Sequence, residues 1–281
     1  MRRAAGRCRA DHHRRWVAAT LLVLSLACAA ADAPPTATNA SSSATDASGN
    51  TLPSDVELVK PGLYRIAGAA GQALVRVGAK GVVVVDPGSG TPQALMAAIG
   101  RIAKTSDPSV RAVVVTAAGP QQAGDVRAFV VAGVPVVVQQ RALAELVRQG
   151  RVPAASTSRS FISYENDYQI RFGEVEVEVE HVGSGRTGAD SVVVFRGLRV
   201  IAVGALFTTD APQPDCASGG SFAGWAAAID HLLWSDFDIA VPSRGAAVGR
   251  RELIDFKAKL ETLARRSASS PSPPADCRPA R

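Results

Sequence analysis

The sequence predicts an α/β fold in which two β-sheets pack together and helices cover their outer faces, a four-layer αβ/βα sandwich. Two observations support this prediction. Short valine-rich segments alternate with segments of helical periodicity along the chain. This alternation occurs twice, once in each half of the central region, so each half supplies one set of strands together with the helices that cover it.

The first half opens with two adjacent strands at residues 73–77 and 81–85, joined by a turn at 78–80. Hydrophobic side chains then recur on one side of a helix at residues 92–104, and Pro92 suits the start of that helix. The pattern continues with a strand at 112–115, a helix at 123–131, a strand at 134–138 and a helix at 142–149.

The second half repeats this logic with different lengths. Residues 174–180 alternate glutamate and valine strictly, which is typical of a strand with one wet face and one buried face. A helix at 250–263 carries an apolar stripe that includes Leu253, Phe256 and Leu260. The remaining elements are strands at 192–195, 199–203 and 239–241 and a helix at 222–233.

The N-terminal segment has the three parts of a secretory signal peptide. Six arginines and a single acid stand in residues 2–15, an apolar run follows at 16–31, and small residues end it. The run is about 16 residues long, whereas a membrane-spanning helix needs roughly 20. We therefore expect residues 1–31 to be a signal peptide and the protein to be exported, to the bacterial periplasm or cell envelope.

Two processing sites remain open. Ala29, Ala30 and Ala31 suit ordinary signal peptidase. Residues 24–28, LSLAC, instead resemble a bacterial lipobox with Cys28 as the lipid-bearing residue, although Ser25 stands where leucine is usual. In that case a lipid on Cys28 anchors the protein, and this anchor is the only membrane contact that we expect.

Removal of the signal peptide on export changes the net charge of the protein. The whole chain carries 31 basic and 25 acidic residues, and residues 1–31 hold six of the basic and one of the acidic ones, so the remainder has a net charge of about +1. That charge gives no basis for nucleic-acid binding. Residues 32–54 and 267–281 lack large apolar groups, so we expect a flexible linker and a disordered tail on either side of one domain at 55–266.

The segment VVVTAAGPQQAG at residues 113–124 resembles the first signature of the metallo-β-lactamase superfamily, a buried strand followed by Thr-His-x-His-x-Asp-His. The strand, the threonine (Thr116) and the final glycine are present. Ala117, Gly119 and Gln122 stand at the three histidine positions, and Gln121 stands at the aspartate position.

Four further segments resemble the same superfamily in the same order. VVVDPG at 83–88 is similar to the early strand that ends in Asp-x-Gly, here with Asp86. GRTGAD at 185–190 resembles Gly-His-Thr-x-x-Asp, with Arg186 in place of histidine and Thr187 retained. VGALF at 203–207 has Ala205 in place of the bridging aspartate, and VPSRG at 241–245 has Arg244 in place of the last histidine. The resemblance implies the four-layer metallo-β-lactamase-type sandwich.

The resemblance also implies that the zinc site of the superfamily is lost. A dinuclear hydrolase of this type uses about five histidines and two aspartates as ligands. The only histidines after the signal peptide, His181 and His231, fall on no motif position. No metal-activated water is then available, and no serine nucleophile motif is evident. We therefore expect no catalytic residue, no metal and no cofactor.

The two arginines at former histidine positions keep positive charge where a metal would have been. Guanidinium groups bind carboxylates and phosphates in a fork geometry, and buried charges need partners. The partner is either an aspartate, namely Asp86, Asp125 or Asp190, or a bound anionic small molecule. The candidate ligand-binding residues are Asp86, Thr116, Gln122, Arg186, Thr187 and Arg244.

Three functions remain open. The first, which we favour, is a non-catalytic binding or accessory protein of the cell envelope that reuses the cleft, with a protein partner unidentified. The second is a hydrolase with an unorthodox site, in which a perturbed aspartate or His181 acts beside the arginines. The third is a structural protein whose cleft is filled by its own side chains.

Cys216 and Cys277 are the only cysteines that follow the signal region, and an oxidising compartment favours their pairing. We predict that they form a disulfide in the exported protein. Thiol labelling of unreduced, denatured protein should then modify neither residue, and labelling after reduction should modify both. Full labelling of both cysteines without reduction would refute the pairing.

Overall fold

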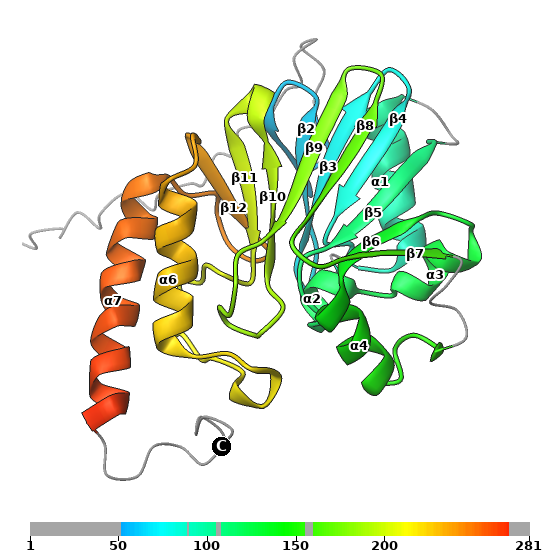
Figure 1. The fold of residues 1–281 in the computed structure, drawn as a ribbon. Helices are drawn as coiled ribbons and strands as arrows, with labels where there is room; N and C mark the ends of the chain where they lie inside the picture. The colour runs from blue at the N-terminus through cyan, green and yellow to red at the C-terminus, as the bar shows by residue number, and fades with distance from the viewer. Residues whose placement is uncertain (1–51, 89, 105–107, 155–159, 270–281) are drawn as a thin grey trace, which may run out of the picture. The chain divides into compact units, whose positions relative to one another are not determined.

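The computed structural model describes residues 52–88, 90–104, 108–154 and 160–269 (Figure 1). A seven-stranded sheet has the strand order β1-β2-β3-β4-β5-β6-β7, antiparallel from β1 to β4 and parallel from β4 to β7. Its strands are β1 (Val56–Lys60), β2 (Leu63–Ala67), β3 (Gln72–Gly78), β4 (Gly81–Val85), β5 (Val110–Val115), β6 (Val136–Gln139) and β7 (Phe161–Tyr164).

A five-stranded sheet has the order β12-β11-β10-β9-β8, in which only the β11–β12 pair is parallel. Its strands are β8 (Asp167–Phe172), β9 (Val175–His181), β10 (Ser191–Phe195), β11 (Val200–Gly204) and β12 (Ile239–Pro242). The helices are α1 (Pro92–Ala103), α2 (Pro120–Ala123), α3 (Val126–Val131), α4 (Gln140–Arg148), α6 (Phe222–Leu233) and α7 (Arg250–Ser269), with 3-10 turns η2 (Arg196–Leu198) and η3 (Cys216–Ser218).

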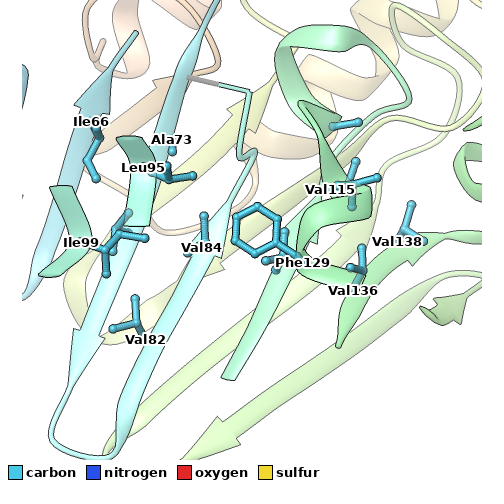
Figure 2. Packing of buried hydrophobic residues seen from close by; sticks show 14 of the residues in the cluster. Ile66, Ala73, Val82, Val84, Leu95, Ile99, Val115, Phe129, Val136 and Val138 are labelled. Carbon is cyan, nitrogen blue, oxygen red and sulfur yellow. The ribbon is translucent and has the colours of Figure 1, made fainter. Parts of the chain in front are cut away.

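Three clusters of buried hydrophobic side chains define the layers. The first lies between the seven-stranded sheet and α1, α3 and α4, and Figure 2 shows Val84 and Val115 of the sheet with Leu95 of α1 and Phe129 of α3. The second lies between the two sheets. The third lies between the five-stranded sheet and the helices α6 and α7, around the fully buried Trp225. The predicted four-layer αβ/βα sandwich is therefore confirmed.

This layering explains the uninterrupted valine runs of the sequence. In β4, Val82 and Val84 point toward the helices, whereas Val83 and Val85 point toward the other sheet. Because side chains alternate between the two faces of a strand, a strand covered on both faces needs apolar residues at every position. The polar alternation of β9 marks the opposite case, since its valines are buried between the sheets while its glutamates lie on the outer face.

The single helix predicted at 123–131 is wrong, because the structure has two short helices, α2 and α3, separated at Gly124 and Asp125. Gly124 has a φ of 52°, and a Cβ at this position would lie 2.8 Å from the carbonyl oxygen of Pro87. The chain thus turns sharply where it packs against the loop after β4, and a continuous helix cannot make that contact.

Several elements were not predicted. Strands β1, β7 and β8 are edge strands, and β2 pairs with β1. Three of the six residues of β8 are exposed, so the strand carries little of the apolar pattern that marks a buried strand. Helix α7 continues to Ser269, three residues beyond the predicted domain boundary at 266. The helix ends further along the chain because Ser and Ala do not by themselves stop a helix.

Other predictions fall outside the described residues. These include the signal peptide at 1–31 with Cys28, the linker as far as residue 51, and the tail from residue 270 with Cys277. Cys216 is disulfide-bonded, but its predicted pairing with Cys277 stays a prediction because Cys277 is not described. In the described part of the chain, no helix combines the length and the apolar character that crossing a bilayer requires.

Helix α7 offers a direct test of the third core cluster. Leu253 is fully buried in that cluster, whereas its neighbour Ile254 is 46% exposed. Leu253→Ala should lower the free energy of unfolding by about 2–5 kcal/mol, because it removes buried methyl groups and leaves a cavity. Ile254→Ala should change it by less than about 1 kcal/mol. Chemical denaturation of both variants measures the difference, and equal losses would contradict this packing.

Candidate functional site

The loops that carry the five motifs meet at one edge of the two sheets, where β4, β5, β11 and β12 end. Backbone hydrogen bonds join them: Ser191 N–H donates to the carbonyl oxygen of Thr116 (2.9 Å), and Ser243 N–H donates to that of Gly204 (2.9 Å). Segments that are far apart in sequence are thereby held together, as the topology of this fold predicts.

Asp86 and Thr116 form a buried pair at the centre of this edge. Asp86 is 3% exposed and follows β4 with a φ of 53°, a left-handed conformation. The backbone N–H of Thr116 donates to Asp86 Oδ1 (2.9 Å), and the Thr116 hydroxyl donates to the same carboxyl group (2.7 Å to Oδ2). Gly204 packs against the pair so closely that a Cβ there would lie 2.3 Å from Thr116 Oγ1.

Burial raises the pKa of Asp86 to about 7, although both hydrogen bonds from Thr116 act to lower it. Asp86 forms no ion pair with Arg186 or Arg244 in the part of the chain that is described. It borders a small pocket of about 10 Å³, which Ser243 also lines. Of the partners that the sequence leaves open for the arginines, Asp86 is thus engaged by Thr116.

Gln122 and Thr187 are also engaged within the protein. The side-chain amide of Gln122, which is buried at the end of α2, donates to the hydroxyl of Ser243. The backbone N–H of Thr187 donates to Asp190 Oδ2 (2.6 Å), and its hydroxyl donates to Oδ1 (3.0 Å). Burial raises the pKa of Asp190 to about 6, against these hydrogen bonds and the charge of Arg186. Both residues therefore fix loop conformation.

Arg186 and Arg244 lie on the walls of one cleft, which we call the arginine cleft. Its volume is about 190 Å³, and its lining also includes Gln121, Ala205 and Ser243. Over the described residues, neither guanidinium group makes an ion pair or a side-chain hydrogen bond. Of the candidate ligand-binding residues, Arg186 and Arg244 line this cleft, and Asp86, Thr116, Gln122 and Thr187 do not. Their role in binding stays a prediction.

The third aspartate considered as a partner, Asp125, is exposed beside α3 and interacts electrostatically with Arg151. Two further residues of the cleft, Phe207 and Asp210, were not singled out from the sequence. They lie in the loop that follows β11, where no periodic pattern marks individual positions. The sequence could have indicated these residues only by their position, because loops that follow strand ends commonly carry the functional site in α/β folds.

A zinc ion, which this architecture commonly holds, does not fit the side chains present. Zinc needs three or four ligands drawn from His, Cys, Asp and Glu, and the described residues contain no group of three such side chains placed to share a metal. The cleft itself has one carboxylate, Asp210. His231 is exposed on α6, and His181 Nδ1 lies 2.8 Å from the carbonyl oxygen of Asp190.

The two packed sheets, the helices that cover them and the loops at their shared edge are those of the metallo-β-lactamase fold. Its solved neighbours include a metallo-β-lactamase from Pontibacter korlensis, with 19% identity over 73% of this chain and 98% of that one and a TM-score of 0.63. The metallo-β-lactamase IND-7 matches with 22% identity over 73% of this chain and 97% of that one (TM-score 0.62), and DIM-1 with 16% over 74% and 97% (TM-score 0.62). No protein-family model and no curated protein sequence matches the chain.

The buried carboxyl group of Asp86 predicts a pH dependence of stability. Its pKa is about 7 in the folded protein against an ordinary value of 3.8, so the folded state binds more protons between these limits. The free energy of unfolding should therefore fall as the pH rises from about 4 to about 7. Asp86→Asn, which keeps an acceptor for Thr116, should remove roughly 2–4 kcal/mol of that fall.

Denaturant unfolding at pH 4.5 and 7.5 measures the effect. Asp255→Asn is the matched control, because Asp255 is a largely exposed residue on α7. Asp190 contributes a fall of the same sign, so the Asp86 variant should retain part of the dependence. An Asp86→Asn protein with the same pH dependence as the unaltered protein would contradict the assignment.

Proposed function

We propose that this protein is an exported, non-hydrolytic member of the metallo-β-lactamase fold that binds a small anion in the arginine cleft. The observation that carries the proposal is the state of Arg186 and Arg244. Both line one cleft, and neither guanidinium group has an ion-pair partner among the described residues. The cleft therefore has two guanidinium groups against one carboxylate, that of Asp210, which leaves an excess of positive charge.

The chemistry of the lining supports an anion as the ligand. A guanidinium group presents several N–H donors in a fixed plane, which matches the oxygens of a carboxylate or phosphate. Gln121 and Ser243 lie in the same cleft and supply neutral hydrogen-bonding groups. The volume of about 190 Å³ is below the roughly 300–1,000 Å³ of sites for drug-sized ligands, so the ligand is small.

The arrangement of the carboxylates favours binding over hydrolysis. Asp86 has a pKa of about 7, which suits a general acid or base. A general base must reach the substrate within hydrogen-bonding distance, whereas Asp86 is occupied by Thr116 and is absent from the cleft lining. His181, the other candidate for an unorthodox hydrolytic site, does not line the cleft either.

The location of this activity is part of the proposal. The basic and apolar N-terminal segment indicates export, and the lipobox-like residues up to Cys28 indicate attachment to the cell envelope. A soluble anion-binding domain on a tether of residues 32–54 would then act as an accessory protein outside the cytoplasm. Radiolabelled fatty acid incorporation that depends on Cys28 would separate the lipoprotein from the soluble form.

Anion binding can be tested with inorganic phosphate and succinate as calorimetric probes. Arg186→Gln combined with Arg244→Gln should weaken binding of both probes at least tenfold, because charged hydrogen bonds contribute about 1.5–3 kcal/mol each. Arg127→Gln, at an exposed position on α3, is the matched control and should bind as the unaltered protein does. Unchanged affinity in the double variant would remove the arginines from the site.

Two further measurements separate binding from the alternative of a hydrolase. Elemental analysis of the purified protein should find less than stoichiometric zinc, since the side chains do not fit that metal. A screen with β-lactam, thioester and phosphodiester substrates should show no turnover. One or two bound zinc ions per chain together with turnover would overturn the proposed binding function and favour the hydrolase.

A further inference from the structure

The arginine cleft contains charge of both signs. Asp210, in the loop after β11, lines the cleft together with Arg186 and Arg244. In the described structure its carboxylate forms no ion pair with either arginine. Three charged side chains therefore line the same small cleft, and those of Arg244 and Asp210 are exposed to solvent.

The position of Asp210 is held by the protein. Its backbone N–H donates to the hydroxyl of Thr208 (3.1 Å), which fixes the turn. The loop is tied at both ends, because the indole N–H of Trp225 donates to the carbonyl oxygen of Leu206 (2.8 Å) and Asp215 N–H donates to that of Arg186 (2.7 Å). The second contact joins the loop that carries the acid directly to the residue that carries one of the basic groups.

An aromatic surface completes the lining. Phe207 and Trp225 both border the cleft. Behind them, Phe256 of α7 contacts both rings, with centroid separations of 5.1 Å to Phe207 and 5.6 Å to Trp225. Such contacts hold the rings in place. Trp225 is fully buried, so it supports the cleft from behind, and the partly exposed ring of Phe207 offers the apolar surface.

We propose that the ligand of the arginine cleft is a small zwitterion of the amino-acid class, with a carboxylate, a protonated amine and an apolar body. This inference rests on the proposed anion-binding function and specifies its ligand. The carboxylate binds Arg186 and Arg244, the ammonium group binds Asp210, and the body lies against Phe207. A ligand with an anionic group alone leaves Asp210 facing it uncompensated, and the resulting repulsion lowers its affinity.

A matched pair of probes isolates the amine. L-Phenylalanine and 3-phenylpropanoate share a carboxylate and an aromatic body, and only the first carries an ammonium group. Calorimetry at pH 7 should show phenylalanine binding about fivefold more tightly, the upper value for a solvent-accessible charge pair. Asp210→Asn should reduce this preference to none, because it weakens the binding of phenylalanine and relieves the repulsion of 3-phenylpropanoate. Asp255→Asn should keep the preference.

The outcomes distinguish this inference from the function on which it rests. Equal affinity for the two probes in the unaltered protein, or a preference that survives Asp210→Asn, overturns the zwitterion and leaves anion binding intact. Binding of phosphate without binding of either aromatic probe at millimolar concentration also overturns the zwitterion and leaves anion binding intact. Failure of phosphate, succinate and both aromatic probes overturns the inference together with the proposed function.

Discussion

The contact on which the site edge depends is the buried hydrogen bonding between Asp86 and Thr116. It joins the ends of two neighbouring parallel strands, β4 and β5, and the close approach of Gly204 brings the end of the second sheet against it. A buried carboxyl group is costly unless it is hydrogen-bonded or neutral, and this one accepts two hydrogen bonds and has a raised pKa. The ends of β4, β5 and β11 meet at this junction, and backbone hydrogen bonds from Ser191 and Ser243 attach the neighbouring loops to it.

Around that junction, the polar side chains divide into two groups. Gln122 with Ser243 and Thr187 with Asp190 satisfy each other inside the protein. The charged side chains of the cleft lining, Arg186, Arg244 and Asp210, form no ion pairs with one another among the described residues. Guanidinium groups supply positive charge and directed donors, which is the basis of the proposed anion binding.

The sequence predicted the layers well because a strand that is buried on both faces needs a continuous run of apolar residues, as the valines of β4 show. Edge strands such as β8 have no such run, since part of their surface is exposed to water. Within the site, the meeting of Arg186 and Arg244 followed from the order of motifs. The bond between Gln122 and Ser243 joins residues 121 positions apart and depends on side-chain geometry, and Asp210 lies in an aperiodic loop. Neither spacing nor composition could reveal those contacts.

Gly119 lies directly against the side chain of Gln122. A Cβ at this position would lie 2.5 Å from Oε1 of Gln122, so a larger residue there would require that amide group to move. The same amide group donates to the hydroxyl of Ser243. A substitution at residue 119 would therefore be transmitted to the loop after β12, and the composition of one loop limits the conformation of another.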